Sequence, residues 1–254
     1  MSYPQMYVAG MKNHYSEIAF VLDRSGSMES CREATIGGFN SFLQEQQKTE
    51  GLARLTLILF NDEYLVPIDA LPVAEILPLD NDSYVPRGST ALLDAIGRTI
   101  DELGARLAAL SEKDRPLQVI VAILTDGLEN SSQDYTWQQI ADVIKQQSEQ
   151  YRWTFLFLGA NQDAIETAAQ MNIKATNAAA YVADAAGLHA SASSLTRKVR
   201  ALRRVSMGKA TAEECQDAAA PMSGSSLRRI GRNGGKQRQS GRLVNRSQPP
   251  ARAR

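Results

Sequence analysis

Cysteine is scarce in this 254-residue chain, because Cys31 and Cys215 are the only two. Two cysteines cannot form a disulfide framework, and neither belongs to a metal-type pair, so we predict free thiols in a reducing cytoplasm. No apolar run approaches the ~18 residues of a membrane span. The first twenty residues also lack the basic start and long apolar stretch of a signal peptide. These absences predict a cytoplasmic protein that does not interact with membranes.

Net charge is also absent overall, but the two ends of the chain differ. Residues 1–196 carry 13 Lys and Arg against 25 Asp and Glu, a net charge of −12, whereas residues 197–254 carry 15 against 3, a net charge of +12. Apolar residues make up 43% of the chain, which is enough for a globular core. The charge split therefore predicts an acidic folded part followed by a basic part of a different kind.

Short apolar runs alternate with longer amphipathic segments over most of the chain. The short runs predict strands at residues 18–22, 55–60, 64–68, 119–124 and 153–158. The amphipathic segments predict helices at residues 29–48, 91–110, 136–150, 163–171 and 187–206. Pro67 indicates that the third strand lies at an edge, hairpin-paired to the second. This alternation predicts an α/β fold with a doubly wound, mostly parallel sheet and one antiparallel edge strand.

We predict two regions, a folded domain at 15–206 and a basic, disordered tail at 207–254. Residues 222–254 contain nine Lys and Arg and no acid, with much Gly, Ser and Gln, so we predict disorder there. The tail allows two interpretations, a site for nucleic acid or an acidic partner, or a solvating appendage. The salt dependence of DNA retention, with and without residues 208–254, would separate them.

Three short polar segments follow predicted strands or open a predicted helix, where α/β folds keep their sites. They supply carboxylates and hydroxyls without sulfur or imidazole, from Asp23, Ser25, Ser27, Thr90 and Asp126. Such hard oxygen ligands favour Mg²⁺, or Mn²⁺ or Ca²⁺, over zinc or copper. The five groups leave at least one of the six positions around Mg²⁺ for an outside oxygen. The sequence therefore predicts an incomplete metal site that accepts a carboxylate from a partner.

These residues resemble the metal-ion-dependent adhesion site of the von Willebrand factor A domain family. The match consists of Asp23-Arg-Ser-Gly-Ser, the lone Thr90, and Asp126 within Thr-Asp-Gly, in the family's order. Segments such as YVPRGSTALLDAIG and LTDGLENSS further resemble stand-alone bacterial and phage members. The resemblance implies a Rossmann-like sheet, direct metal contacts from Ser25, Ser27 and Thr90, and contacts through water from the two aspartates. It also implies that a partner's Glu or Asp completes the metal shell.

Each piece also has a simpler interpretation. Ser25 and Ser27 could cap a following helix, and Asp126 with the next glycine could form a plain turn. Glu129 and Asn130 could line the rim of the site or be solvated loop residues.

Three functions follow from this reasoning. The first is a Mg²⁺-dependent protein-interaction module that is not an enzyme. The second is a metal-assisted phosphohydrolase or nuclease, although the sequence has no glycine-rich phosphate loop and no second acidic cluster. The third is nucleic-acid association through the basic tail.

Overall fold

The computed structural model describes residues 14–160, 163–182 and 185–222. Six strands form one sheet in the order β3-β2-β1-β4-β5-β6, and only the β2–β3 pair is antiparallel. The strands are β1 (Tyr15–Asp23), β2 (Leu52–Phe60), β3 (Tyr64–Pro72), β4 (Gln118–Thr125), β5 (Thr154–Ala160) and β6 (Ala178–Tyr181). The predicted class of doubly wound, mostly parallel sheet with one antiparallel edge strand is confirmed, and β3 with Pro67 is that edge.

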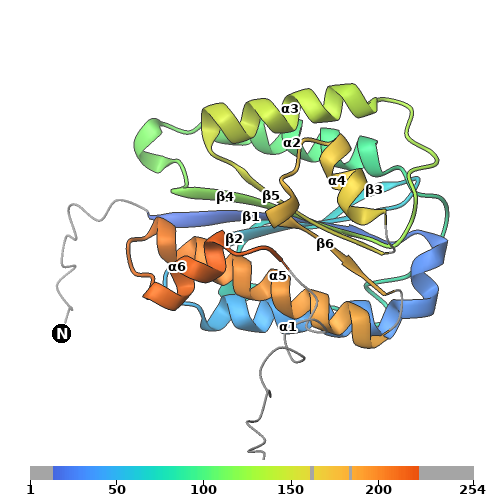
Figure 1. The fold of residues 1–254 in the computed structure, drawn as a ribbon, viewed down its shortest axis with the longest axis horizontal. Coiled ribbons are helices and arrows are strands. Elements are labelled where there is room, and N and C mark those ends of the chain that lie inside the picture. Colours follow the sequence, from blue (N-terminus) through green and yellow to red (C-terminus); the bar gives the residue numbers. More distant parts are fainter. Residues whose placement is uncertain (1–13, 161–162, 183–184, 223–254) are drawn as a thin grey trace, which may run out of the picture.

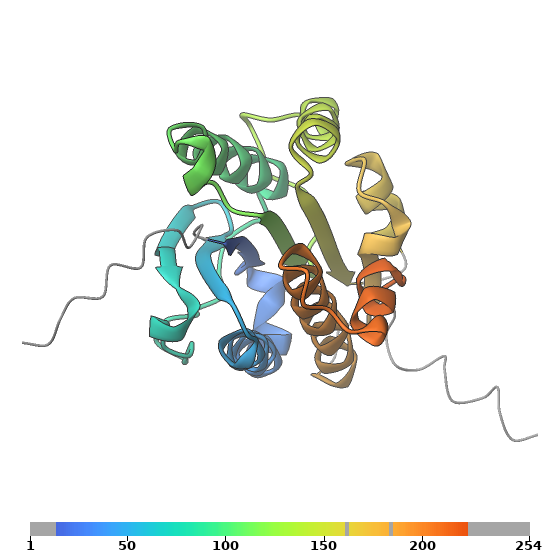
Figure 2. The same cartoon turned by 90° about the vertical axis from the view of Figure 1, so that its left-hand side faces the viewer.

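Helices cover both faces of the sheet, as Figures 1 and 2 show. One face packs against α1 (Arg32–Lys48) and α5 (Ala185–Ser206). The other packs against α2 (Leu92–Ala108), α3 (Trp137–Tyr151) and α4 (Ala164–Gln170). The core therefore lies in two layers, one on each side of a sheet whose central strands are almost entirely buried. Among the described residues, none of these helices combines the length and the apolar character needed to cross a membrane.

The first predicted helix begins differently from the expectation. A 3-10 turn at Gly26–Cys31 precedes α1, which starts at Arg32 rather than at residue 29. Ser25 occupies the cap position of this turn, but its side chain makes no capping hydrogen bond. The hydroxyl of Ser25 is therefore available for contacts at the end of β1.

Two elements were missed by the sequence analysis. The strand β6 consists of three alanines and a tyrosine, which is too short and too rich in alanine to give a strand pattern. The helix α6 (Ala212–Ala219) lies inside the tail for which we predict disorder, so that prediction does not hold there; a capping box between Thr211 and Glu214 opens the helix. Arg204 of α5 pairs with Glu214 at 2.9 Å, which fixes α6 against the domain. Residues 223–254, the rest of the predicted tail, lie outside the described residues, so their predicted disorder stays a prediction.

A buried arginine joins α5 to the end of α1. Arg203 is fully buried and donates hydrogen bonds to the carbonyls of Gln46, at 2.8 Å, and Gly51, at 2.9 Å. Burial lowers the pKa of Arg203 to about 10. Its charge faces the carbonyl end of α1, where the helix dipole is negative, so the contact is electrostatically favourable.

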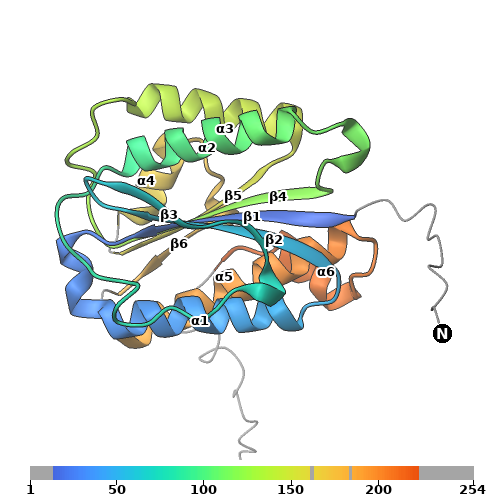
Figure 3. The same ribbon diagram turned by 180° about the vertical axis from the view of Figure 1, so that it is seen from behind.

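The segment between β3 and α2 brings Thr90 to the edge of the sheet where β1 ends. Figure 3 shows this segment running alongside α1. Asn40 of α1 holds the segment through two hydrogen bonds to the backbone of Leu79. Its side-chain amide donates to the Leu79 carbonyl at 2.8 Å and accepts from the Leu79 N–H at 2.7 Å. Side-chain hydrogen bonds from α1 thus help to set the path that leads to the site.

Candidate metal centre

The two aspartates of the predicted site are brought to one edge of the sheet by parallel pairing. Asp23 is the last residue of β1, and Asp126 directly follows β4. β1 and β4 are parallel neighbours, with Leu22 opposite Leu124. Because parallel strands end on the same side, both carboxylates lie at the carboxyl edge of the sheet.

The side chains of Ser25, Ser27 and Asp126 form a chain of contacts. The Oγ atoms of the two serines lie 3.1 Å apart, and the Ser27 hydroxyl donates to Asp126 Oδ1 at 2.7 Å. The segments after β1 and β4 therefore meet through side-chain oxygens, although they are about a hundred residues apart in the sequence.

Asp23 is held by hydrogen bonds on both of its carboxylate oxygens. Its Oδ1 accepts from the backbone N–H of Ser25 at 2.6 Å, and its Oδ2 accepts from the Thr125 hydroxyl at 2.5 Å. The side chain of Asp23 has no exposed surface. These bonds fix the orientation of the carboxylate within the site.

Thr90 approaches from a third segment. The backbone N–H of Gly26 donates to the carbonyl of Gly88 at 3.0 Å, which ties this segment to the turn after β1. The position where a Cβ would sit on Gly127 is 2.6 Å from Thr90 Oγ1 and 3.4 Å from Asp23 Oδ2. Both oxygens therefore crowd around Gly127, and a residue with a side chain would intrude between them.

Burial raises the pKa of both carboxyl groups, and a neighbouring charge adds to the shift of Asp23. Burial raises the pKa of Asp23 to about 6, and the nearby charge of Asp126 also raises it. Burial likewise raises the pKa of Asp126, although its hydrogen bond from Ser27 opposes the effect. A cation between the two groups would compensate for both the burial and the repulsion.

The oxygen donors fit a hard cation such as Mg²⁺. Two carboxylates and three hydroxyls converge, which is the ligand chemistry that Mg²⁺, Mn²⁺ and Ca²⁺ share. Within the described ranges, no three His, Cys, Asp or Glu side chains cluster as metal ligands. A cation here would therefore depend on the hydroxyls of Ser25, Ser27 and Thr90. Ser27 is exposed and Asp126 half-buried, so the site opens to solvent on their side.

Two supporting residues were not assigned a structural role from the sequence. Tyr84 and Tyr181 are buried and donate from their hydroxyls to the carbonyls of Asp23, at 2.6 Å, and Thr125, at 3.2 Å. Each tyrosine therefore supports the end of one strand that carries an aspartate. Neither has a local sequence signal, because the contacts join residues 61 and 56 positions apart.

Glu129 and Asn130, for which the sequence left two interpretations, both make contacts within the protein. The side-chain oxygen of Asn130 accepts from the backbone N–H of Thr90 at 2.9 Å, and the backbone N–H of Asn130 donates to the Thr90 carbonyl at 3.1 Å. Glu129 accepts from the backbone N–H of Leu93 at 3.0 Å, at the start of α2. Both residues thus join the loop after β4 to the segment that carries Thr90.

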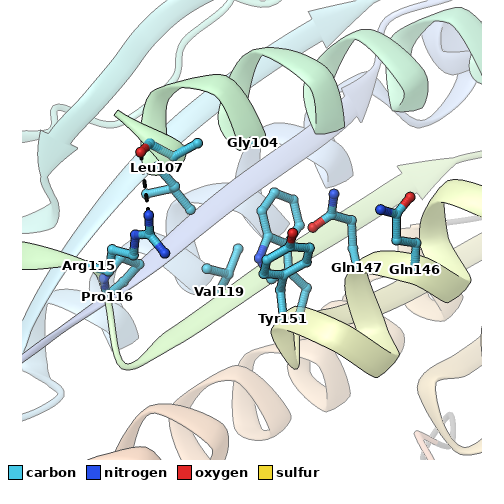
Figure 4. Close-up of a pocket in the computed structure, with 10 residues that line it drawn as sticks. Gly104, Leu107, Arg115, Pro116, Val119, Gln146, Gln147 and Tyr151 are labelled. Atoms are coloured by element: carbon cyan, nitrogen blue, oxygen red, sulfur yellow. Dashed lines mark hydrogen bonds between the residues drawn. The ribbon is translucent and has the colours of Figure 1, made fainter. Parts of the chain in front are cut away.

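Two cavities lie at opposite ends of the domain. One, of about 280 Å³, opens beside Asp126 between the loop after β4 and α4. The other, of about 320 Å³, lies between the last turns of α2 and α3, where Tyr151 and Trp153 line it (Figure 4). Arg115 at its rim donates to the Ala108 carbonyl at 3.4 Å. This second cavity is near the start of β4, so it does not belong to the predicted metal site.

No protein-family model matches the sequence, and no curated protein matches it. Among solved structures, the chain is similar to proximal thread matrix protein 1 from the mussel byssus, at 14% identity and a TM-score of 0.50, covering 75% of this chain and 46% of that one. It is also similar to a von Willebrand factor type A protein from Catenulispora acidiphila, at 16% identity and a TM-score of 0.49. That match covers 74% of this chain and 43% of the other. A manganese-loaded TRAP protein from Plasmodium vivax matches at 20% identity and a TM-score of 0.41, covering 58% and 57%.

These likenesses concern the fold. The chain has a von Willebrand factor A-like fold, as the resemblance of its motifs implied. It spans less than half the length of the mussel and Catenulispora structures.

Proposed function

We propose that this domain is a protein-interaction module that depends on a divalent cation, Mg²⁺ or else Mn²⁺ or Ca²⁺. The cation would be held by Asp23, Ser25, Ser27, Thr90 and Asp126, and an Asp or Glu of a protein partner would complete its shell. The main support is the convergence of five oxygen-bearing side chains from three separate segments on one edge of the sheet. The raised pKa of both aspartates supports the same proposal, because a cation would relieve its cause.

Some residues of the site hold the Asp23 carboxylate in place, and others face the solvent from which a partner would come. Ser25, through its N–H, and Thr125, through its hydroxyl, orient the Asp23 carboxylate. Ser27 and Asp126 stand on the solvent side, where a partner would enter. When bound, the cation supplies positive charge and a coordination position for an outside oxygen.

Binding is a better account of these groups than catalysis. Both oxygens of the buried Asp23 accept hydrogen bonds, so this carboxylate is held in place and is not oriented as a free general base. We also propose a cytoplasmic location, because Cys31 and Cys215 are both unpaired.

The cation site is tested by titrating Mn²⁺ into the metal-free protein and measuring binding by calorimetry. We expect one site in the wild type and none in Asp126→Ala. Asp217→Ala, which removes a carboxylate from α6, is the matched control and should bind Mn²⁺ as the wild type does. Equal binding by Asp126→Ala and the control would overturn the proposed site.

Partner capture is tested by a pull-down from the native host, in Mg²⁺ and in EDTA. We expect the wild type to retain a protein only in Mg²⁺, and Asp126→Ala to retain it in neither condition. A partner that is captured equally in EDTA would contradict the metal-dependent mechanism.

A further inference from the structure

Large aliphatic side chains are exposed at the edge of the sheet that carries the candidate metal site. Leu128 is 71% exposed, Val182 67% and Val85 41%. Exposed apolar groups that gather at one place indicate an interaction surface, whereas single ones need no explanation. Where these three residues lie relative to the metal site therefore decides whether they belong to an interaction surface.

Each of the three residues directly follows a residue that contacts the site. Val85 follows Tyr84, whose hydroxyl binds the Asp23 carbonyl, and Val182 follows Tyr181, whose hydroxyl binds the Thr125 carbonyl. Leu128 follows Gly127, around which the oxygens of Thr90 and Asp23 crowd. We call Val85, Leu128 and Val182 the aliphatic collar.

The three collar residues belong to three separate segments that meet at this edge of the sheet. Val85 belongs to the segment bonded to the turn after β1, Leu128 to the loop after β4, and Val182 to the end of β6. β6 is two strands from β4, which corresponds to about 10 Å. A partner residue seated over Asp126 would therefore have neighbours within reach of the collar.

Leu128 also lines the cavity of about 280 Å³ beside Asp126. The other walls of this cavity include the apolar side chains of Leu92, Trp137 and Phe157. Its volume is just below the range of small-molecule sites, so it suits a single side chain better than a separate ligand. An aliphatic side chain next to the partner's acid would find both a cavity and an exposed leucine.

We propose that the partner of this domain is a protein segment in which the metal-binding Asp or Glu is flanked by aliphatic residues. This inference rests on the proposed function, since the cation's positive charge is what selects the acid. The collar adds the second requirement, because it gains contact only with apolar neighbours. An acid flanked by glycines or charged residues would bind the cation without that gain.

Three blocked tripeptides test the inference on the Mg²⁺-saturated protein, with affinities measured by NMR titration. They are acetyl-Leu-Asp-Leu-amide, acetyl-Gly-Asp-Gly-amide and acetyl-Leu-Asn-Leu-amide. We expect the first to bind about tenfold more tightly than the second, which corresponds to about 1.4 kcal/mol. The third lacks a carboxylate and should not bind. In EDTA, none of the three should bind.

Substitution of the collar separates its contribution from that of the cation. In Leu128→Ser, we expect the preference for leucine over glycine to disappear while Mn²⁺ affinity is unchanged. Leu52→Ser is the matched control, because Leu52 is 65% exposed but lies at the start of β2, at the opposite edge. The control should keep the tenfold preference.

The outcomes distinguish the collar from the proposed function. Equal binding of the two Asp peptides to the wild type would overturn the collar and leave metal-dependent capture of an acid standing. If the metal-loaded protein bound neither Asp peptide at millimolar concentration, capture of an acidic side chain would itself be wrong. Binding of the Asn peptide as tight as that of its Asp counterpart would show apolar binding without the cation.

Discussion

Asp23→Asn should make the metal-free protein more stable while abolishing metal binding. Asp23 is completely buried, and its pKa is raised from 3.8 to about 6. Near pH 7 the carboxylate is charged in both the folded and the unfolded state, and the charge is less favourable in the folded one. A rise of about two pKa units corresponds to about 3 kcal/mol of lost stability.

The sign of the effect sets its pH dependence. A carboxyl group whose pKa is raised by folding contributes stability below its unfolded pKa, and this contribution is lost as the pH rises through the folded pKa. For Asp23 the loss therefore develops between about pH 4 and about pH 6. Asparagine carries no charge at any pH, so the variant should not lose stability as the pH rises through this range.

The hydrogen bonds reduce the expected gain but do not reverse it. One oxygen of asparagine can still accept from the N–H of Ser25, and the amide can donate to the Thr125 hydroxyl, which also accepts. We expect a net gain of about 1–3 kcal/mol near pH 7. For a domain of this size, each kcal/mol raises the melting temperature by about 2–4 °C.

The assay is thermal unfolding followed by circular dichroism in EDTA, at about pH 4 and about pH 7. The variant should melt higher than the wild type at neutral pH, and the two should converge at the lower pH. Mg²⁺ should raise the melting temperature of the wild type alone, because binding to the folded state stabilises it. A variant less stable than the wild type in EDTA at neutral pH, or stabilised equally by Mg²⁺, would refute this reasoning.

Three further substitutions probe the site and its support. Gly127→Ala would place a Cβ 2.6 Å from Thr90 Oγ1, so the Mn²⁺ affinity measured by calorimetry should fall at least tenfold. The control is Gly37→Ala, whose added Cβ would have no neighbour within 4 Å and should leave the Mn²⁺ affinity unchanged. Tyr84→Phe removes the hydroxyl that binds the carbonyl at the end of β1, which should cost about 1–2 kcal/mol in urea unfolding and weaken Mn²⁺ binding several-fold. Arg203→Ala leaves buried carbonyls of the α1–β2 connection without donors and should cost about 3–5 kcal/mol; an unfolding midpoint equal to that of the wild type would contradict this.

The local patterns predicted the elements that are long and strongly patterned. The continuous apolar run at 18–22 lies within β1, and the helical spacing at 91–110 contains α2. The same reasoning missed β6, which is short and rich in alanine, and α6, which is short and has no buried residue to give an apolar spacing. A short alanine segment has little side-chain surface to pattern, so its structure depends on the neighbours it packs against.

The sequence by itself determined the doubly wound fold and proposed five oxygen ligands, because apolar periodicity and a polar motif after a strand are local properties of the chain. Only the tertiary structure decided that Ser27 contacts Asp126, that Tyr84 and Tyr181 support the strand ends, and that Asn130 holds Thr90. These contacts join residues 40 to 99 positions apart. Their geometry exists only once the sheet has brought β1, β4 and β6 to a common edge, so no local pattern could predict them.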